Sequence, residues 1–581
     1  MSGGRRIAAA AALIMLGNVV SRLLGLVRDQ TIGALFGVTA AASIFTAASR
    51  VPTMVYDLLI GGAMTAALVP VFSEYAARAE RPGLRPPTER LGELAGAVIG
   101  LALAVLLPTV AVLVVFARPL MSLLGVGFPP EVQERGILLV RLALPSVVLL
   151  GISAVLMGVL YAQHRVTLPS FSAAVYNLGV IAGALLLTRW LGVTSLVVGI
   201  LAGAAGQVVL LQTGLRGLHL RPHLSLAHPG LRRILRLYAP VAAGLLVSAA
   251  VVTLDTRLAS QTGEASLAAM RFATTLVQFP LGLVANALSF ATLPVLSRYG
   301  TGGAQEAAFQ RTFAQGVKAA LFLIVPATVA LIMLRVPIVR LLFQRGAFRE
   351  EGTQLTALAL LWYAPQLPFV AVDQLLIAAF YALQNTRLPV LVGVLGAGCY
   401  AAIALPLGTA GRMGMPGLVL ANTVQNSIHA VILLVLLWRA TGTMPAEGIG
   451  RAAARIGAAA AVMAAVLATV NYVTPAPVGT VPLVAFLAVA GAIAGGAYLA
   501  TLVALGSEEV TVIRSLILAQ GSRPRHWSSR RLGPVAPAGT LGPGRAQVGR
   551  GQVGRLAAAQ GRDTPGPDGG TESGPPAGGG T

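Results

Sequence analysis

Apolar residues recur along most of the chain in blocks of about 20, which is long enough to cross a ~30 Å hydrocarbon core as helices. Short segments rich in polar residues, glycine and proline separate these blocks. The short alternating strands of a membrane barrel are absent from the pattern. The pattern predicts an all-α polytopic membrane protein with fourteen transmembrane helices, at about residues 8–36, 41–74, 91–117, 132–162, 167–189, 193–215, 234–260, 265–298, 310–334, 354–382, 387–410, 413–438, 452–473 and 480–505.

Charge along the chain predicts how these helices are oriented. Arg5 and Arg6 precede the first apolar run as in a signal peptide, but the run continues to Phe36 without a cleavage site, so we expect an uncleaved first helix. Connections after even-numbered helices are basic and those after odd-numbered helices are not, so both termini are expected in the cytoplasm. Segment 335–351 is an exception, since it carries four arginines on the expected outer side.

Two segments of the first half recur in the second half in the same order. LVPVFSEY (68–75) resembles TLPVLSRY (292–299), and residues 144–169 resemble residues 364–389. The offset corresponds to six predicted helices, an even number, so the repeat is parallel and typical of transporters whose two bundles flank a central site. We therefore expect two six-helix lobes around a central cavity and a C-terminal helix pair. The expected domains are an N-lobe at 1–216, a C-lobe at 217–440, helices 13 and 14 at 441–510, and a disordered basic tail at 511–581.

Composition narrows the class of protein. Of the 581 residues, 56% are hydrophobic and 11% are charged, and the mean hydropathy is +0.79, which excludes a soluble globular protein. The net charge of +22 is spread over loops and the tail, so we expect the lipid bilayer and no nucleic acid as a partner. The single lysine, Lys318, follows no glycine-rich loop, and the single cysteine, Cys399, excludes a disulfide framework. We expect a transporter and not an enzyme.

Charged residues inside the predicted helices are the candidate functional groups, because each costs about 2.5–3.5 kcal/mol at a bilayer centre unless it faces protein or water. In the first helix Arg22, Gly25 and Asp29 share one face, with Arg28 beside it. Other predicted spans contain Arg50, Asp57, Asp255, Arg257 and Arg271.

These residues divide into two groups. The arginines Arg22, Arg50 and Arg271 predict a cationic cavity, in which guanidinium groups bind phosphate with two parallel hydrogen bonds. A cationic cavity implies an anionic substrate. Asp29 is expected to pair with neighbours such as Arg28 and to hold the lobe together, and Gly25 offers a place for the helix to bend. Asp57 belongs to the same structural or gating group.

Several segments resemble the MurJ/MviN family of the multidrug/oligosaccharidyl-lipid/polysaccharide exporter superfamily. They are SRLLGLVRDQTIGALFG (21–37), RVP (50–52), ALVPVFSEY (67–75), FPLGLVANALSFATLPVLSRY (279–299), LLFQRGAFREEGT (341–353) and FYALQNTRLP (380–389). The resemblance covers about residues 7–510. It implies a monomeric multi-pass flippase of the bacterial cytoplasmic membrane that moves lipid II, an undecaprenyl-pyrophosphate-linked peptidoglycan precursor, to the outer leaflet.

The resemblance also assigns roles to positions and shows departures. Arg22 and Arg28 match cavity arginines of the family. The chain has Ser43 and Tyr56 in place of an acidic residue and an arginine, and Thr275 in place of another arginine, which Arg271 one turn earlier can replace. Family members that bind sodium in the second lobe make Asp255 a candidate sodium ligand here. Either the inward-negative membrane potential or a gradient of sodium ions or protons is left open as the driving force.

Two other functions remain open. One is export of a different polyprenyl-linked glycan, or drug/cation antiport within the same superfamily. The other is an enzyme acting on polyprenyl phosphates, which is disfavoured because the loops lack a cluster of acidic residues. If the lobes rock, the short loops 37–40 and 261–264 are expected to approach each other when the cavity opens inward.

Overall fold

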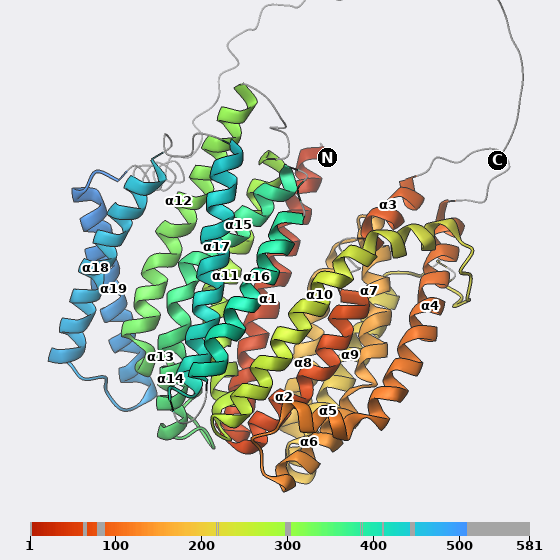
Figure 1. The fold of residues 1–581 in the computed structure, drawn as a ribbon, viewed down its shortest axis with the longest axis horizontal. Coiled ribbons are helices and arrows are strands. Elements are labelled where there is room, and N and C mark those ends of the chain that lie inside the picture. The colour runs from red at the N-terminus through yellow and green to blue at the C-terminus, as the bar shows by residue number, and fades with distance from the viewer. Residues whose placement is uncertain are drawn as a thin grey trace, which may run out of the picture. The chain divides into compact units, whose positions relative to one another are not determined.

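The computed structural model describes residues 3–61, 67–77, 87–216, 218, 220–296, 304–383, 385, 387–408, 412–441 and 448–507 (Figure 1). These residues form helices and no strand, which confirms the predicted all-α class. The helices are α1 (Gly3–Phe36), α2 (Ala40–Tyr56), η1 (Asp57–Gly61), α3 (Val69–Ala77), α4 (Pro87–Val115), α5 (Ala117–Leu124), α6 (Pro130–Ala143), α7 (Ser146–Ala162), α8 (Thr167–Leu191), α9 (Thr194–Thr213), α10 (Pro229–Gln261), α11 (Ser266–Leu296), α12 (Ala304–Met333), α13 (Arg335–Phe343), α14 (Glu350–Tyr363), η3 (Ala364–Gln366), α15 (Leu367–Ala382), α16 (Arg387–Leu407), α17 (Met415–Thr441), α18 (Ile449–Val473) and α19 (Thr480–Ala504).

Membrane-spanning helices account for most of the described chain. Eleven are long and apolar enough to cross a bilayer, and a twelfth is α10 if its two parts, Pro229–Ala239 and Gly244–Gln261, bent by 50°, form one span. The other two predicted spans correspond to α1 and to α2 with η1 and α3. α2 has only 17 residues, fewer than the roughly 20 a perpendicular span needs, and the wider turns of η1 follow it directly.

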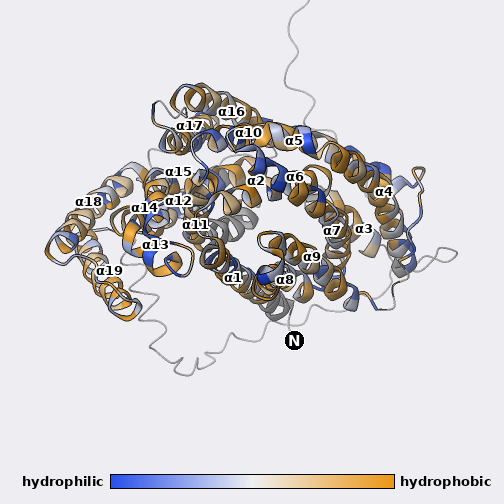
Figure 2. Cartoon of the chain, turned by 90° about the horizontal axis from the view of Figure 1, so that it is seen from below, coloured by the Kyte–Doolittle hydropathy of each residue, from blue (hydrophilic) through white to orange (hydrophobic). Residues whose placement is uncertain are grey.

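Small residues allow the helices of the N-terminal half to approach closely. A Cβ atom at Gly183 of α8 would lie 2.6 Å from the Cα atom of Gly199 in α9, and one at Gly179 would overlap the backbone of Gly203. Gly17 of α1 lies equally close to the backbone of Ser170 in α8. Such small-residue contacts are a usual basis of helix association in membranes, where burial of apolar surface gives little driving force. Viewed end-on, α2, α6, α7, α9, α8 and α1 follow one another around a ring (Figure 2).

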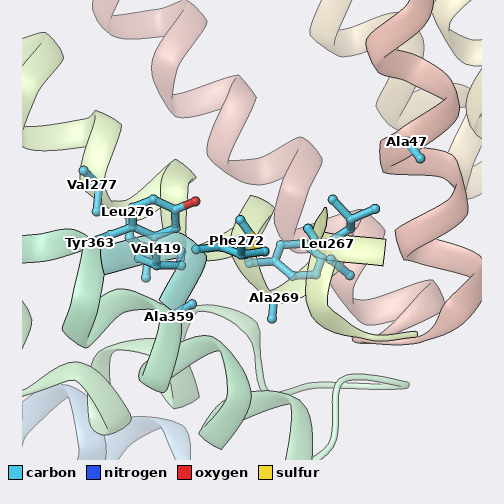
Figure 3. Packing of buried hydrophobic residues seen from close by; sticks show 14 of the residues in the cluster. Ala47, Leu267, Ala269, Phe272, Leu276, Val277, Ala359, Tyr363 and Val419 are labelled. Atoms are coloured by element: carbon cyan, nitrogen blue, oxygen red, sulfur yellow. The ribbon is translucent and has the colours of Figure 1, made fainter. Parts of the chain in front are cut away.

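A hydrophobic core joins α11 to helices of both halves of the chain. The rings of Phe272 and Phe343 lie 5.1 Å apart, and Phe272 meets the ring of Phe348 edge-on at 5.3 Å. Phe272, Leu276 and Tyr363 line up in this core (Figure 3). α11 also contacts the first half: a Cβ atom at Gly33 of α1 would lie 3.6 Å from the Phe272 ring, and α11 packs against α2.

The two halves of the chain also touch at one end of the molecule, which we call the closed end and define by Gly37, Ser43, Gly127, Ser260 and Ala347. The backbone N–H of Ala347 donates to the Ala34 carbonyl at 2.8 Å, and the N–H of Ala268 donates to Ser43 Oγ at 3.1 Å. The N–H of Gly127 donates to Ser260 Oγ at 3.2 Å.

Glycine makes one of these contacts at the closed end possible. Gly37 and Gly346 both have positive φ angles, of 64° and 60°, which side-chain-bearing residues adopt at a cost. A Cβ atom on either residue would overlap a carbonyl of the opposite segment. Val38 lies against Gly352, whereas a Cβ atom at Gly263 would have only Ser266 within 4 Å. In this structure Val38 and Gly263 are not in contact, and the expected approach of loops 37–40 and 261–264 when the cavity opens inward stays a prediction.

α18 and α19 form a separate cluster against α12. Ile456, Met463 and Leu467 of α18 pack with Phe322, and Tyr498 Oη of α19 donates to the Phe322 carbonyl at 3.0 Å. The division into lobes at 1–216 and 217–440 and a pair at 441–510 stays a prediction. The predicted disordered tail at 511–581 lies outside the described residues.

Candidate substrate-binding cavity

A cavity of about 800 Å³ lies between helices of the two halves of the chain. Its lining residues come from α1, α2 and η1 of the first half of the chain and from α10, α11, α14, η3, α15 and α17 of the second half. Every charged candidate of the sequence analysis except Arg257 lines it, together with Gly25: Arg22, Arg28, Asp29, Arg50, Asp57, Asp255 and Arg271. The structure thus brings together residues that are up to 249 positions apart in the sequence, counted from Arg22 to Arg271.

Asp29 is the centre of a charged cluster between α1 and α11. Its side chain is only 2% exposed, and Oδ1 accepts from Arg28 Nε and from a terminal nitrogen of Arg271, both at 3.0 Å. Oδ2 accepts from Thr275 Oγ1 at 2.6 Å. A buried carboxylate is stable only when it is paired and hydrogen-bonded, and both oxygens of Asp29 meet that condition. Thr275, at the position of the missing family arginine, therefore shares its partner with Arg271.

Arg28 extends this cluster into the N-terminal half. Its terminal nitrogen donates to Asn177 Oδ1 of α8 at 3.0 Å, and Asn177 Nδ2 donates back to the Ser21 carbonyl of α1 at 3.0 Å. The Arg271 guanidinium lies 5.3 Å from the centre of the Phe45 ring. Arg28 and Arg271 also line a smaller pocket of about 220 Å³ behind the cavity, with Tyr176 and Ser146. Both guanidinium groups are thus held in place while they face open space.

A second cluster joins α2 to α10 and α16. Arg50 donates to Asp255 Oδ2 at 3.0 Å and to Thr256 Oγ1 at 2.7 Å, and Tyr400 Oη donates to Asp255 Oδ1 at 2.7 Å. The predicted sodium site needs free oxygen ligands. Here both carboxylate oxygens of Asp255 already accept hydrogen bonds, and a guanidinium supplies the positive charge. These contacts do not fit a sodium ion at Asp255.

Arg22 differs from the other cavity arginines. Its guanidinium donates to the backbone carbonyl of Gln278 in α11 at 2.9 Å, and among the described residues it forms no ion pair. The group lies directly against Gly282, so closely that a Cβ atom on that residue would overlap it. α11 thus positions Arg22 through a carbonyl and a glycine, neither of which neutralises its charge.

The remaining candidates are also at the cavity. Asp57 is exposed and begins η1, immediately after α2. α1 runs through Gly25 as one helix, and a Cβ atom there would lie 3.7 Å from Asn177 Nδ2. A bend at Gly25 and a gating role for Asp57 stay predictions.

Charge is distributed unevenly around the cavity. On the wall formed by α1 and α11, the three arginines Arg22, Arg28 and Arg271 face one carboxylate, Asp29, and this leaves an excess of two positive charges. Arg50 and Asp255 cancel each other on a second wall, formed by α2 and α10, and Asp57 adds one negative charge to the lining. Because arginine binds phosphate oxygens in a bidentate manner, the α1–α11 wall is suited to an anion such as a pyrophosphate.

The uncharged polar residues of the cavity were not predicted from the sequence. Asn426 of α17 donates to Gln366 at 2.5 Å and to Asn422 at 3.2 Å, and all three line the cavity. Their spacing could have predicted them, since Asn422 and Asn426 are four residues apart inside an apolar helix and therefore share a face. Tyr400, the partner of Asp255, was missed because a tyrosine in an apolar helix is most often a packing residue.

Comparison with known proteins gives one consistent result. The family model described as lipid II flippase MurJ matches residues 32–488. A probable lipid II flippase MurJ of Bdellovibrio bacteriovorus is 29% identical over 442 residues, which are 74% of this chain and 82% of the relative. The lipid II flippase MurJ of Burkholderia cenocepacia is 26% identical, with 65% of this chain and 73% of the relative covered.

Solved structures agree in fold. A lipid II flippase MurJ in an inward closed conformation matches with a TM-score of 0.71 and 21% identity, over 87% of this chain and all of that one. An inward-facing multidrug resistance MATE family transporter of the MOP superfamily matches with a TM-score of 0.60 and 16% identity, over 73% of this chain and 95% of that one. The predicted fold of a multi-helix transporter is thereby confirmed.

Proposed function

The chain belongs to the lipid II flippase MurJ family, and we propose that it moves lipid II from the inner to the outer leaflet of the bacterial cytoplasmic membrane. The observation that carries the proposal is the cavity wall on which Arg22, Arg28 and Arg271 outnumber the single carboxylate Asp29. In this proposal the pyrophosphate of the substrate binds to that wall. The glycan occupies the rest of the 800 Å³ space, and the polyprenyl chain stays among the lipids.

The proposed roles of the three arginines differ. Arg22 is the main phosphate ligand, because it has no carboxylate partner among the described residues and its guanidinium is free to form a bidentate contact. Arg28 and Arg271 are each tied to Asp29, so they present a fixed positive charge with their remaining N–H groups. Arg50, which is neutralised by Asp255, supports the second wall and contacts the substrate only secondarily.

Alternating access is the proposed mechanism. The closed end is held by one backbone–backbone hydrogen bond, by two hydrogen bonds from backbone N–H groups to serine hydroxyls and by contacts between small residues. These can separate at modest cost, since a single hydrogen bond contributes only about 0.5–1.5 kcal/mol net. Opening of the closed end, with closure at the opposite end, would expose the cavity to the outer side. In this proposal the chain acts as a monomer with both termini in the cytoplasm.

The test uses the purified full chain in proteoliposomes with fluorescent lipid II. Movement between leaflets is followed by the fraction of the label that a membrane-impermeant quencher reaches. We expect Arg22→Ala to abolish movement. Arg118→Ala is the matched control, because Arg118 is exposed and pairs with Glu134 on α6, away from the cavity. If wild-type protein leaves the label distribution unchanged, lipid II is not the substrate.

Export of another polyprenyl-linked glycan, or drug/cation antiport, is the alternative. The likeness to a MATE transporter supports the shared fold. The excess positive charge at the α1–α11 wall favours a pyrophosphate-linked glycan over an organic cation. The same proteoliposomes loaded with a different polyprenyl-pyrophosphate glycan, or with a cationic dye, distinguish the three substrates.

A further inference from the structure

A histidine and a carboxylate form a pair inside the second half of the chain, outside the clusters described above. His429 of α17 lies 2.7 Å from Asp373 of α15, measured from Nδ1 to Oδ1. Its other ring nitrogen, Nε2, lies 3.4 Å from the carbonyl oxygen of Pro389 in α16. The two side chains are only 15% and 17% exposed. An ionisable pair within membrane-spanning helices is costly and is by default a candidate for function.

The pair continues the polar lining of the cavity. Asn422, Asn426 and His429 are spaced as i, i+4 and i+7 on α17, and the first two line the cavity. Gln366 and Val370 also line it, and Asp373 follows them with the same spacing. Each member of the pair therefore lies one turn beyond the cavity on a helix face that the cavity already uses.

The internal repeat shows that helix packing does not require this pair. Asp373 corresponds to Ser153 in the first half, when residues 144–169 are aligned with 364–389. The equivalent helices there, α7 and α9, contain no acidic, basic or histidine residue, and they nevertheless pack against each other, as α15 and α17 do. A buried ionic pair adds little or nothing to stability compared with apolar residues of similar size, so a structural need does not account for it.

The surroundings of the imidazole suit its protonated form. Asp373 is the charged group that acts on His429 from α15, α16 contributes the Pro389 carbonyl and Gly393, and α17 itself contributes uncharged Gln425 and Asn426. Both ring nitrogens face oxygen acceptors, which an imidazolium satisfies with two N–H donors and a neutral imidazole with one. Proton uptake by the ring makes the pair neutral, and proton release leaves one negative charge in an apolar lobe.

We propose that the His429–Asp373 pair is the proton-binding site through which this transporter couples movement of its substrate to a proton gradient. The substrate part of this inference rests on the proposed function, whereas binding of the proton does not. A proton is taken up by the imidazole from water on one side of the membrane and released to water on the other, after the lobes have changed orientation. Asn426 and Gln366, which are hydrogen-bonded to each other and line the cavity, lie within two turns of the pair on the same helix faces.

The first test observes the proton itself. The full chain, with ¹⁵N-labelled histidine, is titrated in nanodiscs between about pH 5 and pH 9, a range that covers imidazole titration. His429→Asn, which keeps a donor to Asp373 but cannot take up a proton, assigns the signal among the six histidines of the sequence. We expect the His429 signal to titrate and Asp373→Asn to change that titration, with the His228 signal as the unchanged control. A His429 signal that is constant over this range overturns the proposal.

The second test measures coupling in proteoliposomes with fluorescent lipid II and an imposed pH gradient. We expect the gradient to accelerate flipping by the wild-type protein and to have no effect on His429→Asn or Asp373→Asn. The double variant Asp373→His with His429→Asp keeps the pair and should regain the response. Single variants that respond like the wild type overturn the coupling role. If the wild-type protein does not move lipid II but His429 titrates with Asp373, the proposed function fails while the proton site stands.

Discussion

Arg271 of α11 and Asp29 of α1 form a 3.0 Å ion pair although 242 positions separate them in the sequence. The carboxylate is 2% exposed and the guanidinium side chain 18% exposed, so the pair is shielded from water. It connects the first helix of one half to the second helix of the other, at the wall of the cavity. Any movement of α1 against α11 has to carry this pair as a unit or break it.

Arg271→Thr is expected to destabilise the protein, because it leaves Asp29 with one cation fewer in a buried site. Breaking a buried pair costs about 3–5 kcal/mol, and the loss should appear as a lower midpoint of thermal unfolding in detergent. Adding Thr275→Arg should restore the midpoint and flipping, because Thr275 already donates to the other oxygen of Asp29. A double variant no better than the single one would show that the cation must come from position 271.

Arg22→Ala is expected to abolish flipping and Arg22→Lys to leave partial activity. Lysine keeps the charge but loses the two-pronged hydrogen-bond geometry of the guanidinium. Arg22 has no ion-pair partner among the described residues, so both variants should unfold at nearly the wild-type temperature. Full complementation of a depleted strain by Arg22→Ala would refute a role for this cation in the cavity.

Gly282→Ala is expected to reduce flipping without removing any charge. The new methyl group would occupy the place of the Arg22 guanidinium, which is at the end of a flexible side chain and has to move. Gly457→Ala is the matched control, because nothing lies within 4 Å of a Cβ atom there, and helix propensity favours alanine by about 0.5–1 kcal/mol. A Gly282→Ala protein that flips lipid II as fast as Gly457→Ala would show that Arg22 does not depend on this glycine.

Cysteines at Val38 and Gly352 are expected to cross-link and to stop transport. A Cβ atom at Gly352 would lie 3.1 Å from Val38 Cβ, so a shift of a few tenths of an ångström brings the two atoms to the separation of about 3.5–4.5 Å found in disulfides. With Cys399 replaced by alanine, oxidation should hold the closed end shut and reduction should restore flipping. Efficient cross-linking with undiminished flipping would contradict opening at the closed end.

Acid is expected to weaken the start of α10 through His228. Burial lowers the pKa of this imidazole below its usual value of 6.5, and Nδ1 accepts from the N–H of Gly230 at 3.1 Å. Between the lowered pKa and 6.5 the unfolded chain binds more protons, so this contribution is complete above pH 6.5 and is lost as the pH falls through the folded value. His228→Asn keeps the helix cap, and its unfolding temperature should depend less on pH over that window. Identical pH profiles for both proteins would rule out this effect.

The sequence was sufficient for the helices and for most of the charged groups of the cavity. Apolar block length predicts spans because hydrocarbon thickness imposes it, and charges inside such blocks must meet protein or water, which places Arg22 and Asp29 in the cavity. The hydrogen-bonding partners of these charged groups could not be predicted from helix length and charge alone. Tyr400 pairs with Asp255, and Thr275 with Asp29, only because particular helices cross at particular points.

Uncharged polar residues illustrate the same limit. Asn177 of α8 connects Arg28 to the backbone of α1, but in the sequence it is one amide in a long apolar helix. Glycines such as Gly282 are also ambiguous, since the sequence contains 67 of them and only the crossing of α1 and α11 shows which one makes room for a guanidinium. Helical periodicity shows on which face of its own helix a residue lies. To predict a contact, the position of the neighbouring helix must be known as well.

The position of Arg28 next to Asp29 has a consequence for biosynthesis. Asp29 is made early, whereas Arg271 follows 242 residues later, which is roughly 10–50 s at ribosomal rates of about 5–20 residues per second. During that interval the first helix has to enter the bilayer with its carboxylate lacking its later partner. Arg28 is the next residue toward the N-terminus, and its Nε is 3.0 Å from the Asp29 carboxylate. The nascent helix therefore carries a counter-ion for Asp29 before Arg271 has been synthesised, and Arg28 keeps this contact in the folded protein.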